Sequence, residues 1–244
     1  MAENWSGFSY IVTNLARFIR PNEITFSGVN STPPMLACLL AKRAYDWDFV
    51  YINVAGGVDP SPSSIPISSS DPLLAEGSAS IFANEDFYDL CTRGRMDLTF
   101  LGAAQLDGEG NANNSCIGDW SHPKVRLPGG GGGAVMLPTA KRACTWRTEH
   151  SKRTLVKKLD FVTSWGGMHG VVTPIAVFVK REGRLALQSW HPESSLEEVR
   201  ERTGFSFDAT DATPTALPTA REREALAVLD PQGQFECDAA IRLR

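Results

Sequence analysis

The sequence FVYINVAG at residues 49–56 decides the fold class of this chain. It is an almost unbroken apolar run that ends in small residues, as is typical of a strand covered on both faces in a parallel sheet. Before it, Pro34 leads a stretch of strong helix formers at residues 34–43. A short strand is expected before that helix, at residues 23–27. Strand, helix and strand in this order form a βαβ unit and predict an α/β protein.

The same alternation continues on both sides of this unit. Apolar residues at helical spacing predict a helix over residues 8–19 that ends at Arg20-Pro21. Further elements are expected as helices at 84–91 and 194–204, strands at 97–101, 142–147 and 159–163, a basic helix between the last two strands, and a hairpin of 175–179 with 185–190 that turns at Glu182-Gly183. We expect one α/β domain over residues 1–244, with an open, mostly parallel sheet flanked by helices and a C-terminal tail from about residue 209.

The composition is that of an ordinary globular protein. The 244 residues are 42% hydrophobic and 21% charged, with a net charge of −4. No stretch approaches the roughly 18–20 apolar residues that a membrane span needs, and the acidic balance offers no basic field for nucleic acid. The first residues lack the basic and apolar regions of a signal peptide. We therefore expect a cytoplasmic protein that binds neither membranes nor nucleic acid.

The cysteines and histidines predict neither a disulfide framework nor a metal site. The five cysteines contain no CxxC pair, and the four histidines show no HxxxH or HExxH spacing. Zinc clusters and disulfide frameworks require patterns of this kind. We expect no metal and five structural thiols, at Cys38, Cys91, Cys116, Cys144 and Cys237.

Three loops follow predicted strands and should lie at the sheet edge where open α/β proteins bind ligands. They are residues 28–32, 55–59 and 102–107, and each combines small residues with a polar side chain that could orient a ligand. One such loop alone could be a tight turn, but three on one edge favour a binding site. The candidate contacts are Asn30, Ser31, Asn53, Val54, Ala55, Gly56 and Gln105. Gln105 could instead satisfy backbone groups within a turn.

The run LPGGGGGA at residues 127–134 is the strongest local anomaly. Ordering each glycine costs about 0.5–1 kcal/mol relative to alanine. A flexible linker would tolerate this cost, but linkers usually join separate domains, and this run lies between elements of one fold. The alternative is that backbone N–H groups bind an anion or an oxyanion. The run is neither a Walker loop nor a GxGxxG turn. The candidate donors are Gly131, Gly132, Gly133 and Ala134.

Several motifs together resemble the β subunits of family I CoA-transferases, such as glutaconate CoA-transferase. They are GAAQLD at 102–107, GNAN at 110–113, IGDW at 117–120, HPK at 122–124, GGA at 132–134, EHSKR at 149–153, LDFVTS at 159–164, PESSLEEV at 192–199 and TGF at 203–205. The similarity covers roughly residues 22–230. It implies the family's α/β fold and an acyl-CoA substrate, with CoA entering as part of that substrate and no separate cofactor. Arg126, beside the glycine run, is then a candidate for a CoA phosphate or for an interface salt bridge.

In this family a glutamate at the end of the second strand attacks the thioester, and Val54 stands at the matching position. A valine is neither a nucleophile, a base nor an acid, so CoA transfer through this residue is excluded. Neighbouring acids do not replace the glutamate. Asp59 lies further along the chain before Pro60, and Asp48 lies at the other end of the strand.

Val54, the Ala-Gly-Gly that follows it and the long glycine run resemble a branch of this superfamily that hydrolyses a ring. That branch opens the last carbocyclic ring of the cholesterol nucleus while the substrate remains a CoA thioester. The resemblance implies an α2β2 heterotetramer with its active site between subunits. The catalytic glutamate is expected in the α subunit and no catalytic residue in this chain, which would line the pocket. The alternatives are a CoA-transferase β subunit and a non-catalytic acyl-CoA-binding subunit.

Overall fold

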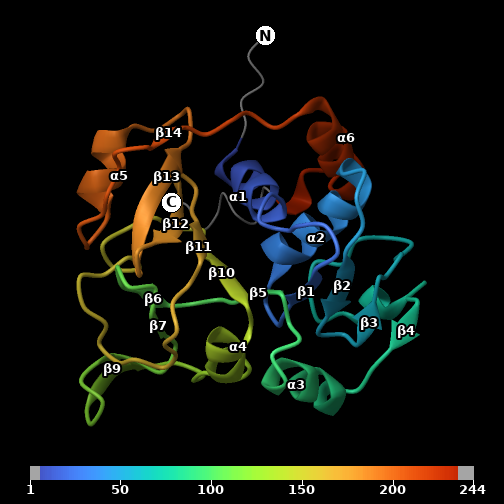
Figure 1. Ribbon diagram of the computed structural model, residues 1–244, viewed down its shortest axis with the longest axis horizontal. Coiled ribbons are helices and arrows are strands. Elements are labelled where there is room, and N and C mark those ends of the chain that lie inside the picture. The colour runs from blue at the N-terminus through green and yellow to red at the C-terminus, as the bar shows by residue number, and fades with distance from the viewer. Residues whose placement is uncertain (1–5, 236–244) are drawn as a thin grey trace.

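The structure is a computed structural model that describes residues 6–235. Its centre is a sheet of ten strands in the order β14-β13-β12-β11-β10-β5-β1-β2-β3-β4, with helices on both faces (Figure 1). The neighbours β11, β10, β5, β1 and β2 are parallel. Antiparallel strands extend the sheet at both margins, and β14 adds a short parallel pairing to β13. This architecture confirms the predicted fold class.

The strands of the large sheet are short. They are β1 (Ile24–Ser27), β2 (Val50–Asn53), β3 (Gly57–Val58), β4 (Ser80–Ile81), β5 (Leu98–Phe100), β10 (Arg142–Trp146), β11 (Gly170–Val172), β12 (Ala176–Arg181), β13 (Arg184–Trp190) and β14 (Thr213–Pro214). Two small hairpins stand apart from it, formed by β6 (Gln105–Leu106) with β7 (Ala112–Asn113) and by β8 (Cys116–Gly118) with β9 (Pro123–Arg126).

Alternation along the strands gives the sheet two apolar cores. In β2, Tyr51 belongs to one core and Ile52 to the other, as side chains of successive strand residues point to opposite faces. The first core lies under α1 (Gly7–Ala16), α2 (Thr32–Ala44) and α6 (Ala220–Leu229). The second lies under α3 (Asn84–Thr92), α4 (Gly133–Thr139) and α5 (Leu196–Arg202). A 3₁₀ turn, η1 (Pro72–Ala75), places Leu74 in the first core.

Most of the predicted elements are confirmed within one to three residues. The hairpin of β12 and β13 turns at Glu182 and Gly183, whose φ angles of 48° and 81° match the primed turn that favours glycine. Helix α5 begins after Ser195, whose side chain accepts a hydrogen bond from the N–H of Glu198. Four of the five cysteines are buried free thiols, and Cys237 lies outside the described residues.

The predicted strand at 159–163 and the basic helix before it are wrong. Residues 147–169 form turns and two isolated bridges, which pair Leu155 with Leu106 and Ser164 with Ala112. The backbone of this segment is bonded to the small β6–β7 hairpin, because Val156 donates to the Leu106 carbonyl and Thr163 to the Ala112 carbonyl. Its apolar residues therefore cover a hairpin and do not join the main sheet.

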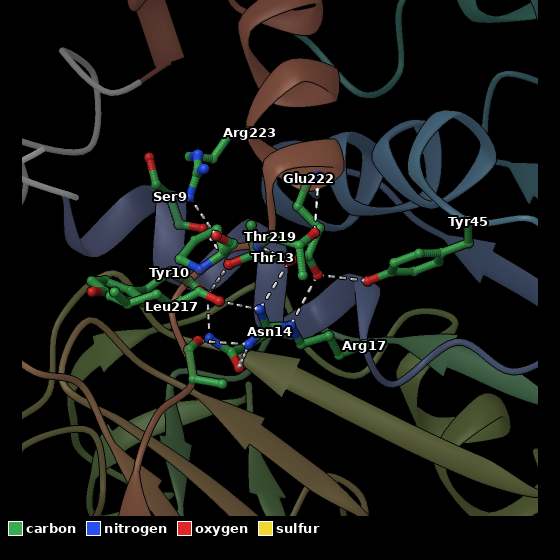
Figure 2. Close-up of polar contacts among 12 residues, drawn as sticks. Ser9, Tyr10, Thr13, Asn14, Arg17, Tyr45, Leu217, Thr219, Glu222 and Arg223 are labelled. Atoms are coloured by element: carbon green, nitrogen blue, oxygen red, sulfur yellow. Dashed lines mark hydrogen bonds and ion pairs between the residues drawn. The ribbon is translucent and has the colours of Figure 1, made fainter.

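The tail after residue 208 is tied to the rest of the chain by β14 and by α6, which packs on α2. Figure 2 shows the cluster of polar contacts that holds α6. Glu222 is 2% exposed, and its two carboxylate oxygens accept hydrogen bonds from Nε and Nη2 of Arg17 at 3.0 and 2.9 Å. The Tyr45 hydroxyl and the Thr219 N–H also donate to this carboxylate, at 3.0 and 2.7 Å. One carboxylate therefore joins α6 to the ends of α1 and α2.

Burial and hydrogen bonding act in opposite directions on this carboxylate. Burial alone would raise the pKa of Glu222, but the hydrogen bonds from Arg17 and from the Thr219 backbone outweigh it and hold the pKa below its ordinary value of 4.5. A lowered pKa means that Glu222 contributes stability above its unfolded-state pKa and loses this contribution as the pH falls through the folded-state pKa.

Substitution Glu222→Gln should destabilise the chain by about 2 kcal/mol at pH 7, because Arg17 then keeps a partly buried charge without its partner. The measurement is urea unfolding. Glu224→Gln, on the exposed side of the same helix, is the control and should change stability by less than about 0.5 kcal/mol. The deficit of the Glu222→Gln variant should shrink below about pH 4.5. A deficit independent of pH would contradict this account.

Candidate functional site

The three candidate loops begin at one edge of the sheet, as parallel pairing requires. Ser27 at the end of β1 is in register with Asn53 at the end of β2 and with Phe100 at the end of β5. Cys144 of β10 is in register with Phe100 on the other side of β5. β1, β2 and β5 therefore end in register, and β10 runs two residues further to Trp146. Residues that follow β1, β5 and β10 line a common cavity, whereas none of its described lining comes from the loop after β2.

A cavity of about 340 Å³ opens at these strand ends. Its walls come from α1, from the loop after β1 and the start of α2, from the residues after β5, from the end of β10, from a segment before η1 and from Phe235. The lining residues are Phe8, Asn30, Thr32, Pro33, Ile67, Ser68, Ser69, Gly102, Trp146, Arg147, Thr148 and Phe235. Among these described residues there is no carboxylate, imidazole or thiol, and Arg147 carries the one charge.

Hydrogen bonds fix the wall around the loop after β1. The N–H of Ser31 donates to Oγ of Ser69 at 2.8 Å, and that hydroxyl donates to the Gly28 carbonyl at 3.0 Å. Asn30 has a φ of 52° and an exposed side chain in the cavity wall. Of the predicted contacts, Asn30 is therefore placed at the cavity, and Ser31 supports the wall from a buried position.

Asn53 is buried, and its side-chain amide is engaged within the chain. Nδ2 donates to the Leu74 carbonyl at 2.9 Å, and Oδ1 accepts from the N–H of Ala55 at 2.9 Å and of Gly57 at 3.4 Å. The side chain thereby fixes the turn after β2, including Gly56, whose φ is 95°. The predicted substrate contacts of Asn53, Ala55 and Gly56 remain predictions, and the amide of Asn53 is not free to make one in this arrangement.

Val54 is partly buried and packs against the second core. Its N–H donates to the Ser27 carbonyl at 3.1 Å, which continues the pairing of β2 with β1. The nearest acid along the chain is directed back along β2, because Asp59 accepts from the Tyr51 N–H at 2.9 Å and pairs with Lys42 at 2.9 Å. The end of β2 is therefore apolar, because the carboxylate of Asp59 is bonded elsewhere and does not lie beside Val54.

Gln105 is buried in a network of side chains between two loops. Nε2 donates to the Asp160 carboxylate at 3.0 Å, and Oε1 accepts from Nδ2 of Asn113 at 2.7 Å. Oε1 also accepts from the N–H of Asp160 at 3.3 Å. This arrangement matches the turn-stabilising alternative, and direct contact of Gln105 with substrate remains a prediction.

The glycine run leads directly into α4. Gly132 is the N-cap residue, and Gly129 and Gly131 have φ angles of 95° and 47°. The N–H of Gly133 donates back to the Gly130 carbonyl at 2.8 Å. Within the described chain, the N–H groups of Gly131, Gly132 and Ala134 have no hydrogen-bond acceptor. These donors fit the predicted anion or oxyanion site, which itself remains a prediction.

Asn114 links the glycine run to the cavity, and it was not among the residues predicted from the sequence. Its Nδ2 donates to the carbonyl of Gly102 and its Oδ1 accepts from the N–H of Ala104, both at 2.8 Å. Its own carbonyl accepts from the N–H of Gly129 at 2.7 Å. The available signal was an asparagine directly after the GNAN motif, a residue type that commonly bonds to nearby backbone groups.

Arg126 lies on an exposed surface and does not line the cavity. Its guanidinium lies over the ring of Trp120 at 4.5 Å, and that ring is stacked on Phe161 at 4.5 Å. Further exposed apolar residues lie on the same hairpin and the adjoining loop, and we call the whole set the aromatic surface: Trp120, Val125, Arg126, Phe161, Val162 and Trp165. Contact of Arg126 with a CoA phosphate remains a prediction.

The described residues carry neither a metal cluster nor a membrane-spanning helix. In residues 6–235 no group of three or more His, Cys, Asp and Glu side chains is placed to hold a metal ion. The helices of this part of the chain are all too short or too polar to cross a membrane.

The sequence pattern of the family described as Coenzyme A transferase matches residues 9–202. The B subunit of 3-oxoadipate CoA-transferase from Pseudomonas knackmussii is 33% identical over 235 residues, which cover 88% of this chain and 89% of the relative. The IpdB subunit of the cholesterol ring-cleaving hydrolase from Rhodococcus jostii is 26% identical over 208 residues, which cover 70% of this chain and 80% of the relative. The crystal structure of the decarboxylase AibA/AibB superposes with a TM-score of 0.88 at 28% identity, covering 96% of this chain and 98% of that chain.

Substitution Asn114→Ala should reduce stability by about 1–2 kcal/mol, because it removes two hydrogen bonds to the loop after β5. Amide hydrogen exchange should accelerate at Ala104, whose N–H loses one of its two acceptors. Gln188→Ala, at an exposed position of β13, serves as the control. Unchanged exchange at Ala104 together with unchanged stability would show that Asn114 does not hold this loop.

Proposed function

This chain belongs to the coenzyme A transferase family, and on that premise we propose that it is the β subunit of a heteromeric hydrolase that acts on an acyl-CoA. The reaction is hydrolysis of a C–C bond in a cyclic β-keto thioester, the last carbocyclic ring left from a steroid. The chain binds the substrate, and the α subunit of an α2β2 assembly supplies the catalytic glutamate. CoA enters as part of the substrate, no further cofactor takes part, and the enzyme works in the cytoplasm.

The observation that carries this proposal is the apolar end of β2. By the sequence resemblance, Val54 matches the position at which the transferases keep their nucleophile, and Asp59 bonds instead to the N–H of Tyr51 and to Lys42. A carboxylate beside the thioester would divert a ring-opening enzyme into acyl transfer, and valine removes this branch. The 26% identity to the ring-cleaving IpdB subunit supports the same choice.

Ring opening needs a base that activates water and donors that stabilise the alkoxide formed when water adds to the ring ketone. The described lining of the cavity has no group that acts as a base near neutral pH, which supports a base from another chain. The N–H groups at the start of α4 are the donors that we assign to the thioester or oxyanion. Asn114 connects these donors to Gly102 in the cavity wall.

Two groups of exposed apolar side chains support a partner subunit, one at the cavity and one on the aromatic surface. Ile67 lines the cavity and is 64% exposed, and Val29, which precedes the lining residue Asn30, is 69% exposed. On the aromatic surface, Trp120 and Trp165 are 51% and 68% exposed. Clustered exposure of large apolar residues is typical of a surface that another chain covers. An α subunit seated here would complete the cavity and place its glutamate opposite Val54.

Two other functions are distinguished by their products. A CoA-transferase β subunit is favoured by the 33% identity to the 3-oxoadipate enzyme, and it would move CoA to an added carboxylate. A non-catalytic acyl-CoA-binding subunit would change no substrate with any partner.

The test is to co-express this chain with the α-type protein encoded beside it and to analyse acyl-CoA products by mass spectrometry. The complex should add one water to a cyclic β-keto thioester and release no thiol, and the isolated chain should be inactive. Release of free thiol without ring opening, or transfer of CoA to added acetate or succinate, would refute the proposal.

Substitution Val54→Glu restores the residue type of the transferases and should not accelerate ring opening. We expect the rate to fall, because a carboxylate that packs against an apolar core needs a partner which this site lacks. Val54→Gln, which has a similar shape without the charge, separates the effect of the carboxylate from that of size. A faster hydrolase in the glutamate variant would contradict the role assigned to Val54.

A further inference from the structure

Arg147 lies in the wall of the cavity, directly after the end of β10. Trp146 and Thr148 beside it line the same cavity. Nη1 of Arg147 donates to the Ala103 carbonyl at 2.7 Å, which anchors the guanidinium to the loop after β5. The side chain is therefore held by its far end at the point where two of the parallel strands finish.

The charge of Arg147 has no counter-ion among residues 6–235. No described carboxylate lies within the 4.0 Å of an ion pair, and Glu149 acts on it only from a longer distance. Nε of Arg147 is buried and has no hydrogen-bond partner in this part of the chain. Arg17 and Arg142, also partly buried, each pair with a glutamate. Burial lowers the pKa of Arg147, as expected for a cation that its surroundings do not compensate.

We propose that Arg147 is the carboxylate-binding residue of this cavity, and that the acyl group of the substrate or product carries a free carboxylate that pairs with it. With Nη1 occupied by Ala103, the edge formed by Nε and Nη2 remains for a ligand. A carboxylate matches two parallel N–H donors on such an edge. Because Nε is buried in this structure, we expect the guanidinium to rotate about its Nη1 contact with the Ala103 carbonyl when the ligand enters.

The rest of the lining favours a carboxylate on a compact acyl group over a phosphate of CoA. Phe8, Pro33, Trp146 and Phe235 give the cavity apolar walls, and its volume of about 340 Å³ suits a small carbon skeleton. The uncharged polar side chains of the lining are those of Asn30, Thr32, Ser68, Ser69 and Thr148. A phosphate with two charges would meet a single cation here.

The inference rests on the proposed function and agrees with its chemistry. Water adds to the ring ketone, the C–C bond breaks, and its electron pair moves to the α carbon of the thioester as an enolate, which takes up a proton. The former ketone carbon becomes a carboxylic acid that ionises at neutral pH. The ring-opened product therefore carries a new carboxylate, and Arg147 is a residue that would hold it.

The test uses the assembled complex and isothermal titration with glutaryl-CoA and its methyl ester, which differ only in the free carboxylate. Wild type should bind glutaryl-CoA about 10- to 100-fold more tightly than the ester, as expected for a hydrogen-bonded ion pair. Arg147→Gln should abolish this preference without changing the affinity for the ester. Arg147→Lys keeps the charge but loses the two parallel donors, and should retain only part of the preference. Arg181→Gln, at an exposed pair with Asp211, is the control.

The outcomes separate the two proposals. An unchanged preference in Arg147→Gln overturns the inference even when ring opening proceeds. Glutaryl-dephospho-CoA lacks the 3′-phosphate of CoA. If Arg147→Gln weakens binding of glutaryl-CoA but not of glutaryl-dephospho-CoA, Arg147 binds the CoA phosphate, and the inference is overturned. If no CoA thioester binds, the proposed function fails, and free glutarate still tests the site. Glutarate should then bind wild type and not Arg147→Gln, and failure to bind wild type overturns the inference.

Discussion

Parallel pairing makes β2, β1 and β5 end in register beside the longer β10, and the polar backbone beyond their last paired residues must then find partners. Short side chains meet this requirement from within the loops. Asn53 bonds the turn after β2, and Asn114 bonds the loop after β5. The hydroxyl of Ser27, at the end of β1, shares a hydrogen bond of 2.7 Å with the hydroxyl of Tyr51 in β2. The loops at these strand ends are thus held by hydrogen bonds within the chain.

Burial of strand faces and backbone hydrogen bonding explain which parts of the fold and site could be predicted from the sequence. Continuous apolar runs such as residues 49–53 identify central strands, because both faces of a parallel sheet are covered. The run at 159–163 has a similar composition, but its backbone is hydrogen-bonded to a small hairpin. The periodicity of apolar residues does not predict which acceptor a backbone N–H will bond to. The turn at Glu182 and Gly183 was predictable, since its residue types match a local backbone requirement. The bond between Arg17 and Glu222 was not, because the two residues are 205 positions apart.

Asparagine and glutamine at strand ends are ambiguous for a related reason. The amide that can orient a substrate can equally satisfy the turn that carries it. Asn53 and Gln105 make internal bonds with both ends of their amides, whereas the side chain of Asn30 is exposed at the cavity. The distinction depends on distances of about one hydrogen bond, which residue type and spacing along the chain do not encode. Polar residues that follow strands therefore predict where a binding site lies, but they do not predict which side chains contact the ligand.

Among the described residues, partly buried cations are paired with carboxylates where helices pack together, but not at the cavity. Arg17 and Glu222 neutralise each other where α6 meets α1 and α2, on the side of the chain built for stability. At the strand ends the balance differs, because the cavity wall holds the cation of Arg147 and β2 is followed by the apolar Val54. A cavity that presents a cation and no base of its own can hold an anionic acyl group, but it cannot activate water for it. Under the proposed function the water-activating carboxylate comes from another chain, which would cover the exposed Ile67 in the cavity lining as it closes over the substrate.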